Sequence, residues 1–331
     1  MCQYSAVDGV VQDWHRVHLG AFAIHKAGLI ITEATAVSPE GRISIDDAGL
    51  WTDAQAEAWA PLVSFSHSLG VPMVVQLAHA GRKASTRAPF KEGPQALDSS
   101  EGGWETLAPS AIAYGDLPAP HDMSAADIAT LVDDFAVAAQ RAVSAGFAGI
   151  EVHAAHGYLL HEFFSPLSNQ RTDTYGGDFS NRTRVAREVC EALRAVIPDS
   201  MPLMVRISAT DWLEGGWDLE QSIQLSQDLE TLGVDFIDVS SGGLRLDQKI
   251  ELGPGYQMPF AKAIKDSVGI AVGTVGLITS AQQAEDAISG GIADVVLMAR
   301  QFLREPSFTT RAAKELGVDL DWVGQYWRAK T

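Results

Sequence analysis

Short apolar runs alternate with longer amphipathic runs along almost the whole chain, and this alternation limits the folds that the sequence can adopt. Seven apolar runs are typical of buried strands, and a stretch with helical periodicity follows each of them. The predicted strands span residues 29–34, 73–77, 149–152, 203–208, 236–240, 270–274 and 295–299. Because parallel strands need a long crossover between them, the pattern predicts a parallel sheet with helical connections.

The helices predicted from the amphipathic runs span residues 13–27, 52–69, 124–145, 181–196, 218–232, 256–267, 280–289 and 307–316. The best-marked one begins after the hydroxyl side chain of Ser124 and stops at Gly146, as helix caps commonly do. Between the second and third strands, the segment from Ala78 to Met123 is rich in Pro and Gly. An irregular excursion of this length is typical of a lid or a loop that shapes a substrate site.

The predicted fold is therefore an α/β (βα)8 TIM barrel, formed as one domain by residues 1–331. Such a barrel needs eight strands, and only seven are recognisable. Residues 1–11 stand where the end of the first strand would be expected, so that strand is predicted to be absent.

Composition excludes several classes of partner. The formal net charge of −18 argues against nucleic acids and anionic membranes. With only Cys2 and Cys190, the chain has no disulfide framework and cannot hold an iron–sulfur cluster by cysteines, which fits a reducing cytoplasm. The sequence shows neither a membrane-spanning apolar run nor a signal-peptide pattern, so we predict a cytoplasmic protein.

Polar side chains gather where the predicted strands end. His153, His156 and Tyr158 follow the third strand, and the carboxyl ends of barrel strands are the usual catalytic positions. Imidazole N–H groups can hold a carbonyl oxygen, and a phenol can supply a proton. On these residues alone, a structural histidine pair and a metal site are open alternatives.

The other strand ends favour a flat cofactor with a phosphate tail. Gln76 offers both a donor and an acceptor, and Arg206 suits an electron-rich heteroaromatic edge. Gly276 and Arg300 follow the last two strands, where barrel enzymes commonly hold phosphate. FMN fits this set, and the alternative is that each residue is an ordinary ion-pairing or capping group.

Several motifs spread over the chain carry a family resemblance. They are residues 1–4, 33–37, 76–83, 108–113, 153–163, 165–173, 175–177, 181–182 and 205–206. Together they resemble the old yellow enzyme family of FMN-dependent ene-reductases, most closely its thermophilic-like subgroup. The run from His153 to Arg182 is the most specific part of the match.

The resemblance implies an NAD(P)H-dependent ene-reductase of the NADPH dehydrogenase type. Its FMN would accept hydride from NADPH or NADH and pass it from N5 to the activated C=C bond of an enone, enal or nitroalkene. His153 and His156 would hold the substrate's oxygen, and Tyr158 would donate the proton. Tyr4 would close on the substrate.

The resemblance also assigns the cofactor site. The implied cofactor-binding residues are Cys2, Ala34, Gln76, Arg206, Gly276, Ala299 and Arg300. Cys2 would tune the flavin potential, and Ala299 and Arg300 would bind the phosphate. Trp327 and Arg328 match a C-terminal tail that reaches a neighbouring subunit's site in relatives, which implies a homodimer or homotetramer.

Two departures from the family pattern lead to further expectations. The N-terminal hairpin and first strand of relatives are absent, which predicts open strand edges and a weakened FMN site. Ala299 stands where relatives usually have Gly. The competing hypotheses are a catalytically impaired flavin-binding barrel and a metal-dependent barrel hydrolase using His153 and His156. The other histidines, His161 among them, are predicted to be structural, and Cys190 to be core.

Overall fold

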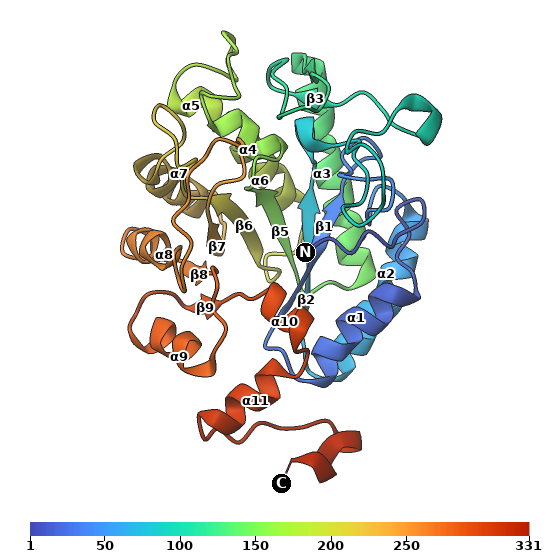
Figure 1. Cartoon of the computed structure of the whole chain (residues 1–331), viewed down its shortest axis with the longest axis vertical. Coiled ribbons are helices and arrows are strands. Elements are labelled where there is room, and N and C mark those ends of the chain that lie inside the picture. Colours follow the sequence, from blue (N-terminus) through green and yellow to red (C-terminus); the bar gives the residue numbers. More distant parts are fainter. Residues whose placement is uncertain (331) are drawn as a thin grey trace.

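A computed structural model describes residues 1–330 of the chain. Its centre is one parallel, seven-stranded sheet with the order β1-β2-β5-β6-β7-β8-β9, surrounded by helices (Figure 1). The strands are β1 (Ile30–Ala36), β2 (Met73–Ala78), β5 (Gly149–Ala154), β6 (Leu203–Ser208), β7 (Phe236–Ser240), β8 (Ala271–Thr274) and β9 (Val295–Val296). The seven predicted strands are all present, and β9 is shorter than predicted.

The predicted helices are also present, with ends that shift by a few residues. They are α1 (Asp13–Ile24), α2 (Asp53–Ser68), α3 (Ala125–Ala145), α6 (Arg184–Val196), α7 (Leu219–Thr231), α8 (Met258–Lys265), α9 (Ala281–Ser289) and α11 (Phe308–Glu315). The Ser124 hydroxyl accepts the N–H of Asp127, and Gly146 ends α3 at φ +85°. Both caps of this helix are therefore those that the sequence predicts.

Three short helices depart from the sequence prediction. The helix expected at 181–196 is divided into α5 (Phe179–Arg182) and α6. Two single-turn helices, α4 (Leu159–Phe164) and α10 (Arg300–Arg304), follow β5 and β9 directly. A helix of five or six residues is too short to show a hydrophobic period, so the sequence pattern does not reveal it.

Alternate residues of the middle strands separate an apolar side from a polar side. Ile150, Val152, Val205 and Ile237 are fully buried in the main apolar core. Because successive strand residues point to opposite faces, the residues between them face the inside of the curled sheet. These inward residues include the charged side chains of Glu151, Arg206 and Asp238, which belong to the candidate site.

The two end strands leave the curled sheet open. Within residues 1–330, no strand pairs along the outer edge of β1 or of β9. Residues 48–50 cover only the end of β1, where Ala36 N–H donates to Ala48 O at 2.9 Å and its oxygen accepts Leu50 N–H at 2.9 Å. A cavity of about 530 Å³ lies between the two end strands and against α1. The prediction of a TIM-type α/β barrel with seven recognisable strands is confirmed.

The long excursion after β2 contains only short elements. They are η1 (Gly81–Lys83), η2 (Ser99–Glu101), β3 (Leu107–Ala108) and β4 (His121–Asp122), and the last two pair in parallel. This excursion lies beyond the carboxyl ends of the strands, at the top of Figure 1. Among the helices of residues 1–330, none has the length and apolar character needed to cross a membrane.

Candidate active site

A row of polar side chains crosses the inner face of the sheet. Gln76 lies beside Glu151 in the register of β2 and β5, and His153 lies beside Arg206 in that of β5 and β6. Arg206 in turn lies beside Asp238 of β7. Because residues in register on neighbouring strands point to the same face, as do residues two apart on one strand, the fold brings these five side chains onto one face of the sheet.

Two buried carboxyl groups hold the predicted cofactor residues. Gln76 Nε2 donates to Glu151 Oε1 at 2.6 Å, and Arg206 Nε lies 3.1 Å from Asp238 Oδ2. Glu151 and Asp238 are fully buried. Burial raises the pKa of both carboxyl groups, while the Arg206 charge opposes the rise. The carboxyl groups thus fix the direction in which Gln76 and Arg206 present their remaining polar atoms.

The cavity between the end strands is lined by two of the predicted flavin-binding side chains. Gln76 and Arg206 line it, and so does Ala299. The amide nitrogen of Gln76 is used on Glu151, which leaves its carbonyl oxygen for a ligand. Arg206 Nε is buried without a well-aligned hydrogen bond. An amide and a guanidinium on one cavity wall are complementary to the imide edge of a flavin ring.

His153, His156 and Tyr158 come together beyond the end of β5. The ring of His153 lies 5.1 Å from that of His156 and 5.1 Å from that of Tyr158, edge to face in both pairs. Burial, with the Arg206 charge second, lowers the pKa of both histidines well below its usual range. Burial raises the pKa of Tyr158. At neutral pH the site therefore offers two neutral imidazoles and a protonated phenol.

Side chains from η1 and β7 hold this group in place. Lys83 Nζ donates to the backbone oxygens of His156 at 2.8 Å and of Gly243 at 3.1 Å. It also lies 4.8 Å from the centre of the Tyr158 ring. The Ser240 hydroxyl is 2.9 Å from His156 Nε2, so the orientation of that hydroxyl influences which ring nitrogen carries the proton.

The N-terminal segment contributes two predicted residues. Cys2 lies against the backbone of Ala34, and burial raises the pKa of its thiol well above the usual range. Tyr4 packs edge to face on Phe90, with ring centres 6.0 Å apart. Cys2 and Tyr4 are both close enough to raise the pKa of Tyr158 further, although burial is the larger cause.

The predicted phosphate residues lie at the end of the sheet where β9 has only two residues. Gly276 is buried and adopts φ +129°, while Ala299 and Arg300 are exposed where α10 begins. The tail residues lie elsewhere. Trp327 is 64% exposed, and Arg328 stacks on it within η3 (Gly324–Ala329). Both residues belong to the C-terminal segment, which lies at the opposite end of the molecule from α4 and the excursion beyond the strand ends (Figure 1).

Sequence reasoning missed several residues of the site. Glu151 and Asp238 interrupt apolar strands two positions from His153 and Ser240, so the alternation of strand faces could have revealed them. The contacts of Lys83 and Ser240 depend on loops that meet only in the folded chain. His161, predicted only to be structural, lies with its Nε2 2.9 Å from Oδ1 of the buried Asp211. Across residues 1–330, no three His, Cys, Asp or Glu side chains are grouped so that they could hold a metal ion.

Comparison with known proteins gives a consistent result. The profile of the NADH:flavin oxidoreductase / NADH oxidase family matches residues 1–319. An NADH:flavin oxidoreductase of Gibberella zeae is 45% identical over 98% of this chain and 83% of its own length. An NADPH dehydrogenase of Geobacillus thermodenitrificans is 44% identical over 99% of this chain and 92% of its own. The solved structure of an old yellow enzyme homologue from Zymomonas mobilis is 28% identical, with a TM-score of 0.75 over 98% of this chain and 90% of that one.

Proposed function

The chain belongs to the NADH:flavin oxidoreductase / NADH oxidase family and is an FMN-dependent NAD(P)H oxidoreductase of the old yellow enzyme type, and on this premise we propose that it reduces activated C=C bonds. The proposed substrates are small α,β-unsaturated carbonyl or nitro compounds. The observation that carries the proposal is the convergence of two neutral imidazoles and one protonated phenol beside Arg206.

His153 and His156 hold the substrate's oxygen by their N–H groups. Donation to that oxygen draws electron density from the conjugated double bond, so its β-carbon becomes a better hydride acceptor. When bound, FMN supplies the hydride, which it has taken from NAD(P)H. Tyr158 delivers its proton to the α-carbon, and its raised pKa keeps that proton on the phenol until the substrate accepts it.

The cofactor would be held by residues from both sides of the cavity. Gln76 and Arg206 would bind the pyrimidine end of the ring, where the guanidinium favours negative charge. Cys2 and the backbone of Ala34 would lie against the ring, and Tyr4 would close over the substrate. The phosphate would be bound where Gly276, Ala299 and Arg300 follow the last two strands.

We assign Trp327 and Arg328 to the site of a neighbouring subunit in a homodimer or homotetramer. Both side chains belong to η3, near the C-terminus. Trp327 is 64% exposed in the single chain, and aromatic side chains of this kind are enriched at subunit interfaces. The assignment predicts that Arg328→Ala lowers activity in the oligomer only. A fully active monomer would contradict the assignment.

The test compares the wild type with Tyr158→Phe. Under anaerobic conditions, NADPH oxidation should match the loss of 2-cyclohexen-1-one in the wild type. The variant should reduce its flavin with NADPH at the normal rate but lose about 10²- to 10⁴-fold in the step that consumes the alkene. Wild-type protein that oxidises NADPH without consuming any activated alkene would overturn the proposal.

A further inference from the structure

The turn that carries His156 and Tyr158 has an unfavourable backbone conformation. His156 adopts φ +60° and the next residue, Gly157, adopts φ +70°. Only glycine fits the second position, because a Cβ atom there would lie 2.3 Å from the oxygen of Gly243. A left-handed non-glycine residue persists when its surroundings hold it in place, so the contacts of this turn need an explanation.

Both N–H groups of the turn are held by side chains. The N–H of His156 donates to Ser208 Oγ at 2.8 Å, and that hydroxyl donates to Gly242 O at 2.8 Å. The N–H of Gly157 donates to His161 Nδ1 at 2.8 Å. A serine and a histidine thus accept the two hydrogen bonds that define the direction of the turn.

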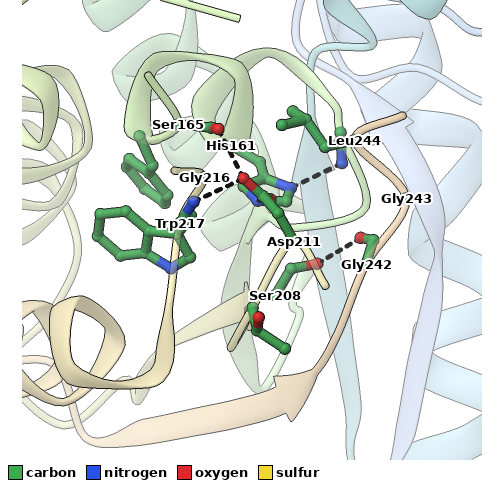
Figure 2. A network of polar contacts seen from close by, with 12 residues as sticks. His161, Ser165, Ser208, Asp211, Gly216, Trp217, Gly242, Gly243 and Leu244 are labelled. Atoms are coloured by element: carbon green, nitrogen blue, oxygen red, sulfur yellow. Dashed lines mark hydrogen bonds and ion pairs between the residues drawn. The ribbon is translucent and has the colours of Figure 1, made fainter. Parts of the chain in front are cut away.

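The bond from Gly157 determines the tautomer of His161. Since Nδ1 accepts this bond, the proton of the neutral ring is on Nε2. Nε2 lies 2.9 Å from Asp211 Oδ1, although its N–H is not aligned on that oxygen, and both side chains are fully buried. Figure 2 shows Asp211 beside His161, with contacts to Ser165 and to the backbone nitrogen of Trp217.

The carboxylate of Asp211 is itself well supported. Its Oδ2 accepts the Ser165 hydroxyl at 2.6 Å and the Trp217 N–H at 2.7 Å. Burial opposes ionisation, but the nearby His161 Nε2 and the hydrogen bond from Ser165 outweigh it and lower the pKa of Asp211. Asp211 is therefore an anion at neutral pH, and it favours the His161 tautomer with the proton on Nε2.

We propose that His161 and Asp211 are a positioning pair for the substrate site: the carboxylate fixes the imidazole tautomer whose Nδ1 holds the Gly157 amide. Through that amide the pair sets the directions of His156 and Tyr158, which flank Gly157. Neither residue touches the substrate in this account. The inference rests on the function proposed above and deepens it.

Two substitutions at His161 separate positioning from stability. Asn places a carbonyl oxygen near the position of Nδ1, so His161→Asn keeps an acceptor for Gly157 but gives Asp211 no donor. Gln reaches the position of Nε2, so His161→Gln keeps a donor for Asp211 but leaves the Gly157 amide unpaired. The proposal therefore predicts opposite orders for the two variants, with His161→Gln the more stable and His161→Asn the more active.

The measurements are the melting temperature, kcat and KM for 2-cyclohexen-1-one, and the Kd of phenol from the absorbance of bound flavin. His161→Gln should raise the KM and the phenol Kd by about tenfold, the size of one lost hydrogen bond, and His161→Asn should change them much less. Flavin reduction by NADPH should be unchanged in both variants. Equal effects, or activity that follows the melting temperature, would overturn the pair's role.

Substitution of Asp211 provides an independent test. In Asp211→Asn the amide oxygen stays on Ser165 and Trp217, and the new NH₂ group faces His161 and favours the proton on Nδ1. That tautomer opposes the Gly157 N–H, so phenol affinity should fall as in His161→Gln. Ser165→Ala removes a bond to the same carboxylate without changing the tautomer, and it should lower the melting temperature only. Normal phenol affinity in Asp211→Asn would contradict the proposal.

The phenol measurement also distinguishes failure of the proposed alkene reduction from failure of the positioning role of His161 and Asp211. If the wild type fails to reduce any activated alkene, the proposed reaction is wrong. The order of phenol affinities among the variants still shows whether the pair positions the turn.

Discussion

The middle strands and the two end strands of the sheet differ in the side chains that they place on its inner face. In β5, β6 and β7 the inward side chains nearest the carboxyl ends are polar, and Glu151, Arg206 and Asp238 lie against one another or against Gln76. Further down the same face, Met204 and Phe236 are apolar and buried. Around the cavity at the two ends of the sheet, several apolar side chains are only partly buried, among them Ile31 of β1 and Leu297 just after β9. Arg300, which follows β9, is exposed.

The difference shows which part of the site the chain orders by itself. The group of His153, His156 and Tyr158, to which we assign the substrate's oxygen, has partners on β6, β7 and η1. Its geometry therefore exists before any ligand arrives, as electrostatic catalysis requires. The phosphate side has a two-residue strand and an exposed arginine. We infer that the substrate side is preorganised and that the phosphate side gains order from its ligand.

The largest expected effect comes from breaking the polar middle. Arg206→Leu leaves the fully buried carboxyl group of Asp238 without its cation and should cost about 3–5 kcal/mol of unfolding free energy. Leu297→Ala at the open end shortens an apolar side chain that is only partly buried. It should lower the free energy of unfolding by less than about 2 kcal/mol. Urea denaturation at several FMN concentrations, extrapolated to zero, measures both.

Adding Asp238→Leu to Arg206→Leu provides the control. With both charges gone, most of the lost stability should return, because the cost comes from a buried charge left alone. If Leu297→Ala is the more damaging change, the contrast between the middle and the ends is wrong.

The elements of the sheet were predictable because each strand is an apolar run with a helix behind it. The strands β6 and β7 begin and end at the predicted residues, since Gly, Pro and polar residues bound them. The strand β9 is shorter because only Val295 and Val296 find partners on β8. The helix α4 has six residues, fewer than periodicity can reveal.

The site was predictable only in part. His153, His156, Tyr158, Gln76 and Arg206 stand at strand ends and in matching motifs, so sequence position identifies them. The pairing of His161 with Asp211 joins α4, which follows β5, to the loop after β6, and no sequence spacing encodes it. The charges of Glu151 and Asp238 are visible in the sequence, but their burial beside Gln76 and Arg206 depends on strand register.

The second prediction concerns ligand-induced order. Saturation with FMN should slow amide hydrogen exchange in β8, β9 and α10 more than in β5 and β6. A ligand at 100 times its Kd adds about 2.7 kcal/mol of stability, and only segments that open locally without it can show the full change. Hydrogen-exchange mass spectrometry of the protein with and without FMN measures this. Equal protection in both regions would remove the distinction between a preorganised and an induced side.

The third prediction tests the polar side through its dependence on pH. Glu162 of α4 is fully buried, and its Oε1 accepts the N–H of Arg82 at 3.0 Å. Burial raises the pKa of Glu162 from 4.5 to about 8, against the opposing charge of Arg82. The folded state thus keeps a proton that the unfolded state releases. Between these two values, rising pH lowers the unfolding free energy, by at most about 1.4 kcal/mol per pH unit.

Glu162→Gln cannot ionise and still offers a carbonyl oxygen to Arg82. Relative to the wild type, this variant should therefore gain stability as the pH rises from below 4.5 to above 8, and the gain should level off beyond that. Urea denaturation over this pH range measures the difference, with Glu220→Gln on the exposed face of α7 as the matched control. If the curves of Glu162→Gln and the wild type stay parallel, Glu162 is ionised in the folded state, and burial does not hold its proton.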